Sequence, residues 1–244
     1  MASSTFVFMC LALGVVVVRG QTGPSPTAVP SDKLLRFLHI VSGYQSGEKQ
    51  VAQDKKKNVP NPHPLAESYA IPVYVPVLGE IPAFYMEEFI NKVSIRRYIT
   101  TVIENQDGNL IVTPYNITVD VKLQKNGVLD TNVILNLKKE DLSDSGRNCD
   151  GIYYEVSKNE FIGLFPDCSQ SLEANNPKYF GYSNCHYSVG IVAHPGAKEG
   201  VHPVPFELNK IRKPLLPYMM KGNEKFKSSC GPTPRDRVIQ WPSA

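Results

Sequence analysis

The stretch Cys149–Cys168 reads CDGIYYEVSKNEFIGLFPDC and indicates the fold class more directly than any other part of the chain. Its two alternating apolar runs, Ile152–Val156 and Phe161–Phe165, are separated by a short polar break. Successive side chains of a β-strand point to opposite faces, so this alternation is typical of an antiparallel hairpin with one buried face. The stretch therefore predicts two adjacent strands of an antiparallel sheet.

The ends of this hairpin carry two cysteines in matching positions. If Lys158 and Asn159 form a two-residue loop, the register places Cys149 directly opposite Cys168. A disulfide that closes a loop of about 20 residues would stabilise the fold by roughly 3 kcal/mol in the chain-entropy model. The alternative is half of a metal site or a reactive thiol, but no histidine lies between the two cysteines.

The first twenty residues, MASSTFVFMCLALGVVVVRG, have the pattern of a secretory signal peptide cleaved after Gly20. The apolar run Phe6–Val18 is too short for a membrane helix, which needs about 20 apolar residues. No later run reaches that length, so we expect a secreted, extracellular protein without a membrane span. Disulfides persist in that oxidising compartment.

Four cysteines remain once a leader containing Cys10 is removed. An even number in a secreted chain suggests two disulfides, and with Cys149–Cys168 assigned by register, Cys185–Cys230 follows by elimination. The sequon Asn116-Ile117-Thr118 predicts a glycan on Asn116. The alternative is that Asn116 is a buried strand residue that never meets the glycosylation machinery.

The segment before the predicted sheet contains a flexible lead-in, a helix and a polar stretch. Residues 21–31 are rich in proline and polar residues, and nothing in them can form a core. A short amphipathic helix follows, with Ser31 as its N-cap and Gly43 at its end. Its apolar stripe consists of Leu34, Phe37, Leu38 and Val41. We expect this helix to cover an open edge or end of the sheet.

The polar stretch from Gly43 to Asn61 contains the triplet Lys55-Lys56-Lys57. We expect a solvated loop here, and the alternative is a contact with an acidic partner.

Beyond Pro64 the apolar period changes from helical to two residues. The predicted strands, besides the hairpin, are SYAIPVYVPV, IPAFYMEEFI, SIRRYITTVIE, NLIVTPYNITVDVKL, VLDTNVILNL and CHYSVGIVA. Tight-turn signals such as Gln106-Asp107-Gly108-Asn109 separate them, and prolines 72, 76 and 82 place the first two strands near an edge or a bulge. The expected fold is all-β: an antiparallel, calyx-like barrel with one short N-terminal helix, because closure removes sheet edges. A β-sandwich is the alternative.

We expect one barrel domain over residues 32–200 and an irregular C-terminal segment over residues 201–244. That segment holds seven prolines and eight Lys or Arg against three Asp or Glu. It is either a cover wrapped over the barrel or a basic arm for an acidic matrix polymer.

No phosphate-binding loop, nucleophile elbow or zinc-protease motif occurs, so we assign no catalytic residue and expect no nucleic-acid partner. The histidines at 186, 194 and 202 are eight residues apart. On an extended strand that spacing spans about 26 Å, so no metal site is expected.

A polar constellation inside two predicted strands is the strongest candidate site. On the first strand, alternation places either Glu87 or Glu88 on the apolar side. A carboxylate there needs a partner, and Arg96 or Arg97 on the next strand is within reach. Together with Tyr85, such a set suits a planar ligand that carries carboxylates, and the alternative is a structural ion pair inside the barrel.

These residues also carry a resemblance to the T-type phycobiliprotein chromophore lyases, the CpcT/CpeT family. LLRFLHIVSGYQSGEKQVAQD is similar to the family's opening helix, AFYMEEF to its Tyr-x-Glu-Gln segment and SIRRYITTV to its arginine-bearing strand. The region around the hairpin is similar at Asp141, Leu142, Cys149, Phe161, Gly163 and Cys168. The resemblance covers about residues 33–195; Glu88 replaces the usual Gln, and the basic tail replaces the family's C-terminal region.

The resemblance implies a calyx that holds an open-chain tetrapyrrole, a bilin, which the cyanobacterial members deliver to a phycobiliprotein. By motif position, Tyr85, Glu87 and one of Arg96 or Arg97 would face that ligand. Three hypotheses follow: a secreted, non-catalytic binding protein for a bilin-like or other small amphipathic molecule, a structural component of an extracellular matrix, and, less favoured, a true lyase.

Overall fold

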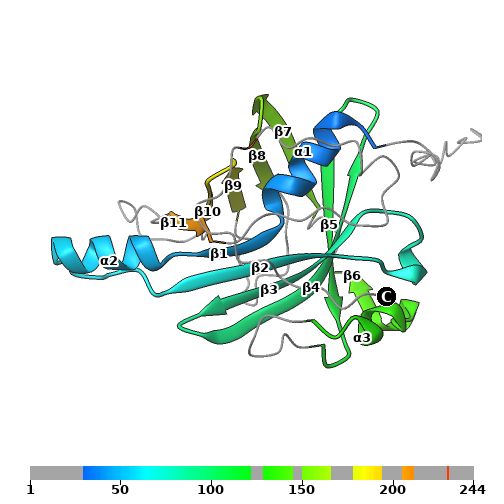
Figure 1. Cartoon of the computed structure of the whole chain (residues 1–244), viewed down its shortest axis with the longest axis horizontal. Coiled ribbons are helices and arrows are strands. Elements are labelled where there is room, and N and C mark those ends of the chain that lie inside the picture. Colours follow the sequence, from blue (N-terminus) through cyan, green and yellow to red (C-terminus); the bar gives the residue numbers. More distant parts are fainter. Residues whose placement is uncertain are drawn as a thin grey trace, which may run out of the picture.

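The computed structural model describes residues 30–121, 129–144, 150–165, 178–193, 205–211 and 230. Within these ranges eleven antiparallel strands form one sheet, in the order β4-β3-β2-β1-β11-β10-β9-β8-β7-β5-β6. The strand β4 also pairs with β5, so ten strands close into a barrel and β6 adds to β5 outside the ring (Figure 1). The predicted all-β, calyx-like barrel is confirmed.

The strands are β1 (Gly43–Ser46), β2 (Ala66–Val73), β3 (Ala83–Ile90), β4 (Val93–Glu104), β5 (Leu110–Ile117), β6 (Leu142–Asp144), β7 (Gly151–Ser157), β8 (Glu160–Phe165), β9 (Lys178–Ser183), β10 (Tyr187–Ala193) and β11 (Phe206–Lys210). The helices are α1 (Asp32–Val41), α2 (Glu48–Lys57) and α3 (Thr131–Leu135), with short 3-10 turns η1 (Pro76–Leu78) and η2 (Lys139–Asp141).

The predicted N-terminal helix is α1. The Ser31 hydroxyl accepts a hydrogen bond from the Leu34 N–H, which satisfies one of the free donors of the first turn. The apolar stripe is buried, with Phe37 and Leu38 at 2% and 0% exposure. The Ser42 N–H donates to the Leu38 carbonyl and ends the helix.

Several segments differ from the prediction, including β6 and β9, which were not expected as strands. The polar stretch expected to be a loop forms β1 and α2, because β1 pairs with both β2 and β11 and the lysine-rich segment favours a helix. The expected strand VLDTNVILNL contains α3, since Asp130 caps it by accepting from the Asn132 N–H. The tail contributes β11, which fills the gap between β1 and β10.

The helix α1 lies against the concave side of the sheet. Inward-facing residues of β2, β3, β4, β5, β7 and β8 all pack with it; they are Ala70, Phe84, Val102, Leu110, Val112, Tyr153 and Phe161. The strands β2 and β8 are far apart in the ring, so both can reach one helix only on its inner side (Figure 1). The Phe37 ring at the centre is 4.8 Å from the Tyr153 ring and 5.1 Å from the Phe161 ring.

A second core lies on the outer side of β2, β3, β4 and β5. It combines Ile71, Tyr85 and Ile99 of the barrel wall with Val121, Leu129 and Ile134 from the connection that contains α3. Because side chains alternate along a strand, odd-numbered residues of β3 face this outer core and even-numbered residues face the interior. This alternation decides where each candidate site residue lies.

The β7–β8 hairpin has its predicted turn, with Ser157 paired to Glu160. Beyond the turn the register shifts, because a bulge between Glu155 and Ser157 leaves Glu155 opposite Phe161. The uninterrupted register behind the predicted Cys149–Cys168 disulfide therefore does not hold. Both cysteines lie outside the described residues, and that disulfide stays a prediction.

The second predicted disulfide, Cys185–Cys230, is present, and Cys230 packs against the inner core.

Two prolines occupy strand positions where no ladder hydrogen bond is lost. Pro72 lies beyond Ala70, the last residue of β2 that pairs with β1, as its predicted edge placement requires. Pro114 lies between the part of β5 that pairs with β7 and the part that pairs with β6.

A row of glycines makes room for one aromatic ring inside the barrel. Gly163, Gly181 and Gly190 are cross-strand neighbours on β8, β9 and β10. A Cβ built on Gly163 would lie 2.4 Å from the Tyr153 ring, whereas one on Gly190 would meet no atom of the described residues within 4 Å. The inner wall is therefore tightly packed at Gly163 and open at Gly190.

The Gly163→Ala substitution should lower the free energy of unfolding by about 1–3 kcal/mol, because the Tyr153 ring must move. Gly190→Ala is the matched control and should leave stability unchanged or raise it by up to ~1 kcal/mol. Urea unfolding followed by circular dichroism measures both. Equal destabilisation by the two substitutions would contradict this packing.

Candidate functional site

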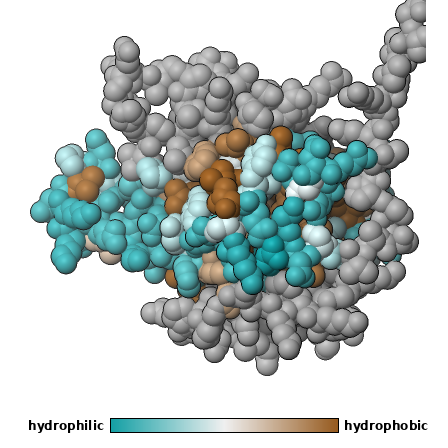
Figure 2. All heavy atoms as spheres, turned by 90° about the horizontal axis from the view of Figure 1, so that it is seen from above, coloured by the Kyte–Doolittle hydropathy of each residue, from teal (hydrophilic) through white to brown (hydrophobic). Residues whose placement is uncertain are grey.

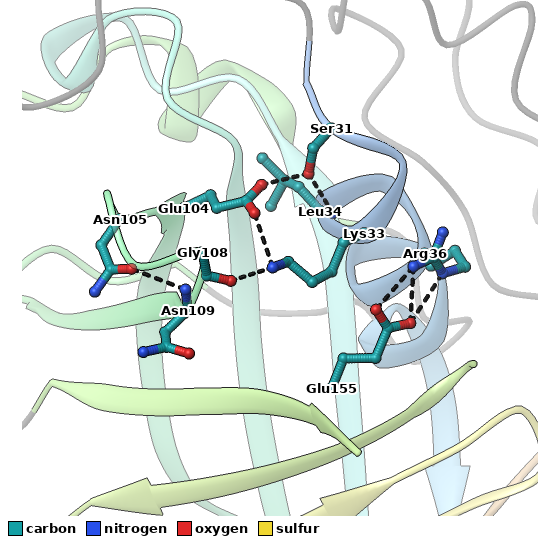
Figure 3. Close-up of polar contacts among 9 residues, drawn as sticks. All are labelled: Ser31, Lys33, Leu34, Arg36, Glu104, Asn105, Gly108, Asn109 and Glu155. Carbon is teal, nitrogen blue, oxygen red and sulfur yellow. Dashed lines mark hydrogen bonds and ion pairs between the residues drawn. The ribbon is translucent and has the colours of Figure 1, made fainter. Parts of the chain in front are cut away.

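Ion pairs fix α1 across the end of the barrel (Figure 3). Glu104 at the end of β4 pairs with Lys33 at 2.8 Å and also accepts from Ser31. The Arg36 guanidinium donates to both carboxylate oxygens of Glu155 on β7, at 2.8 and 2.9 Å. These contacts tie one helix to two separate strands, so the apolar stripe of α1 has a single orientation over the interior.

A row of polar side chains crosses the inner wall. The registers of β11, β1, β2, β3 and β4 place five residues side by side on the inner face: Lys210, Gln45, Ser68, Glu88 and Arg96. Cross-strand neighbours point to the same face of a sheet. We call this set the inner polar row.

One end of the inner polar row forms a compact network. The Tyr98 hydroxyl donates to Glu88 Oε1 at 2.7 Å, and the Arg96 guanidinium lies 4.4 Å from the centre of the Tyr98 ring. Burial, followed by the Glu88 carboxylate, raises the pKa of Tyr98 well above its usual range. The same two causes raise the pKa of Tyr153 to about 12. Both tyrosines are hydrogen-bond donors over the whole physiological pH range.

The inner wall also carries two buried polar groups that no described residue satisfies. Lys210 is 7% exposed and Thr100 6% exposed, and neither the Lys210 Nζ nor the Thr100 Oγ1 has a hydrogen-bond partner among the described residues. Burial lowers the pKa of Lys210 to about 7. Unsatisfied buried groups are uncommon because each costs about 1–3 kcal/mol, so a ligand that satisfies them gains binding energy.

The strand that carries Lys210 is held from both sides. The Gln50 side chain of α2 donates to the Pro205 carbonyl at 2.8 Å and accepts from the Glu207 N–H at 3.1 Å. At the other end, the Lys210 N–H donates to the His186 carbonyl at 2.9 Å. The backbone of β11 is therefore held at both of its ends.

The neighbourhood of Gln50 contains an Asp-His pair. Asp54 Oδ2 lies 2.6 Å from His63 Nδ1 and accepts from the His63 N–H at 2.8 Å, and these bonds lower the pKa of Asp54. The ring of His63 packs edge-on against Phe206 at the start of β11. This pair fastens α2 to the barrel.

The structure separates the residues that the sequence analysis grouped as ligand-binding. Tyr85, Glu87 and Arg97 come together on the outer face, where the Tyr85 hydroxyl donates to Glu87 Oε2 at 2.7 Å and to the Val121 carbonyl at 3.2 Å. Arg97 donates to the same carbonyl at 2.8 Å and to Asp120 at 2.9 Å. Burial and Glu87 raise the pKa of Tyr85 above its usual range.

This outer cluster borders a pocket of about 310 Å³ near the start of β4, whose lining includes both Arg96 and Arg97 together with Thr118 and Asp120. Its arginine and carboxylate are already paired with each other. The outer cluster thus has the chemistry of a structural network. It lies outside the barrel, whereas the alternative to a ligand site was an ion pair inside it.

Arg96 alone of the predicted set lies on the inner face. The interior still contains a tyrosine, a carboxylate and an arginine, but they are Tyr98, Glu88 and Arg96. Strand alternation left the choice between the two faces open, and the position of α1 decides it. The sequence pattern did not indicate that Lys210 faces the interior, because β11 lies in a proline-rich segment that is typical of irregular structure.

Asn116 lies within β5, half-buried, and pairs with Tyr98 and Ser143. A half-buried strand position fits the alternative to a glycan, in which Asn116 is a strand residue. Glycosylation of Asn116 stays a prediction. Most of the basic segment 201–244, and all of the predicted leader, lie outside the described residues.

No protein-family model matches the sequence, and a search of curated proteins found none similar to it. The resemblance to the CpcT/CpeT family therefore stays a hypothesis. In the part of the chain that the structure describes, no helix has the length and apolar character needed to cross a membrane.

Lys210→Met tests the inner polar row through the pH dependence of stability. The pKa of Lys210 is about 7 in the folded protein and about 10.4 in the unfolded chain, so the unfolded state binds more protons between these values. The folded wild type should therefore gain stability relative to Lys210→Met as pH rises from 7 to 9.

Urea unfolding at pH 7 and pH 9 measures this effect, with exposed Lys49→Met on α2 as the control. The difference in the free energy of unfolding between Lys49→Met and the wild type should be the same at pH 7 and at pH 9. A pH-independent difference for Lys210→Met would show that its amine is hydrated or paired.

Proposed function

We propose that this chain is a secreted, non-catalytic, calyx-type binding protein for a bilin-like or other small amphipathic ligand. The observation that carries the proposal is the pair of unsatisfied buried groups, Lys210 Nζ and Thr100 Oγ1, on the inner wall of a closed barrel. Ligand sites in proteins combine an apolar lining with a few placed polar groups, and the mouths of barrels are a common location.

The interior supplies both parts of such a site. The inner core around Phe37, Tyr153 and Phe161 makes the interior apolar, and no atom of the described residues lies within 4 Å of a Cβ built on Gly190. The inner polar row contains two basic side chains, Arg96 and Lys210, and one carboxylate, Glu88, which already accepts from Tyr98. A ligand with an apolar body and an acidic or carbonyl end matches this distribution.

The choice of a bilin as ligand comes from the sequence. A bilin has a planar body and propionate groups, and the resemblance to the CpcT/CpeT family motivates it as the first probe. Secretion is supported by the leader-like first twenty residues and is compatible with the Cys185–Cys230 disulfide. A lyase activity would require a client protein, and nothing described here favours one.

Arg96→Met and Arg97→Met form a matched pair for testing this site. They change adjacent residues of the same type on opposite faces of β4. Titration of the wild type with biliverdin should shift the visible absorption band at micromolar concentration. Arg96→Met should weaken binding about 10-fold through loss of a charge-assisted contact, whereas Arg97→Met should leave it unchanged.

An absence of any spectral change with the wild type would contradict bilin binding. Equal weakening by the two substitutions would place the site elsewhere than the interior.

A structural component of an extracellular matrix, bound to an acidic polymer, is the second candidate function. The exposed side chains of Lys55, Lys56 and Lys57 in the last turn of α2 favour it. The helix α2 projects from one end of the molecule, and that end is hydrophilic (Figures 1 and 2). Such a basic projection can contact a sulfated or carboxylated polymer without disturbing the barrel.

Substitution of all three lysines by glutamine tests this candidate. Deletion of residues 201–244 is not suitable, because it would also remove β11 from the barrel. Retention on a sulfated polysaccharide column should fall to a lower eluting salt concentration. Gln substitution of Lys92, which lies in the exposed β3–β4 turn, is the single-site control. Unchanged elution of the triple variant would exclude α2 as the contact.

A further inference from the structure

Lys210 is the buried ionisable group whose environment is least explained by folding alone. It ends β11, its backbone is paired on both sides, and its side chain faces the interior as a neighbour of Gln45. The Gln45 side chain donates to the Val41 carbonyl, so the amide is engaged elsewhere. Burial of an unpaired amine costs free energy that an apolar residue of similar length would not cost. Packing alone therefore does not explain a lysine at this position.

The charge state of this amine differs from that of a surface lysine. Desolvation lowers its pKa to about 7, so roughly half of the Lys210 side chains are neutral at that pH. For an exposed lysine the neutral fraction is smaller by a factor on the order of 10³. A neutral, desolvated lysine amine is a nucleophile toward carbonyl groups.

Two features of the surroundings suit a carbonyl ligand. Lys210 is only 7% exposed, and exclusion of water protects an imine from hydrolysis. The Thr100 hydroxyl, on β4 of the same inner wall, has no partner among the described residues and can hydrogen-bond a polar end of an extended ligand.

We infer that the Lys210 amine forms an imine with an amphipathic ligand that carries an aldehyde group. The inference rests on the proposed interior binding site. The Nζ lone pair attacks the carbonyl carbon to form a C–N bond, and the carbonyl oxygen takes up a proton to give a carbinolamine. The two N–H protons of the neutral amine leave with that oxygen as water, and a C=N bond remains. No oxidant or reductant takes part.

The test uses full-length secreted protein with retinal as the probe, a long apolar aldehyde whose absorption reports imine formation. Retinol, the alcohol of the same shape, measures binding without covalent chemistry. After incubation with retinal, sodium cyanoborohydride reduces any imine to a stable secondary amine. Intact mass gives the stoichiometry, and peptide mapping gives the lysine.

We expect one retinyl group per chain, mapped to Lys210, with labelling at least ~10-fold above that of any other lysine, as its larger neutral fraction requires. Lys210→Met should lose the adduct, whereas Lys49→Met should behave as wild type. Mapping of the wild-type adduct needs no variant, so a Lys210→Met protein that fails to fold leaves the result intact.

Each contrary outcome has a separate meaning. Retinol binding without a Lys210 adduct overturns the imine and leaves the interior site in place. Labelling spread over exposed lysines, or unchanged in Lys210→Met, also overturns it. Failure of both retinol and retinal to bind overturns the imine together with the proposed site for amphipathic ligands.

Discussion

The pairing of β11 with both β1 and β10 is the constraint on which the rest of the structure depends. Without this five-residue strand, β1 and β10 would each present an unpaired edge and the sheet would remain open. With it, the ring closes, the inner face becomes concave, and strands as distant as β2 and β8 converge on α1. Closure also brings Lys210 into line with Glu88 and Arg96.

Closure is supported by contacts that come from distant parts of the sequence. Gln50 holds the start of β11, and the Cys185–Cys230 disulfide ties the β9–β10 turn to a residue of the C-terminal segment. Arg36 and Lys33 fix α1 over the interior from the opposite end (Figure 3). The barrel is therefore a product of long-range pairing, and the C-terminal segment belongs to it.

The sequence predicted what depends on local pattern and missed what depends on distant partners. The helix α1 and most strands were predictable because capping and alternation are encoded within a few residues. The strands β1, β9 and β11 were not, because short polar or glycine-containing segments become strands only beside their neighbours. For the site, alternation separated Arg96 from Arg97, but only the position of α1 reveals which of them faces the interior. A one-residue bulge near Val156 likewise leaves no local signal and still shifts the whole hairpin register.

The central claim is that the interior of the barrel holds a small amphipathic molecule against the inner polar row. Native mass spectrometry of the protein purified from its natural source, combined with its absorption spectrum, tests this claim most directly. The account predicts a small molecule bound in a one-to-one ratio that is released on unfolding, with a visible band if it is a bilin. A mass explained entirely by the chain, its disulfides and any glycan would contradict it.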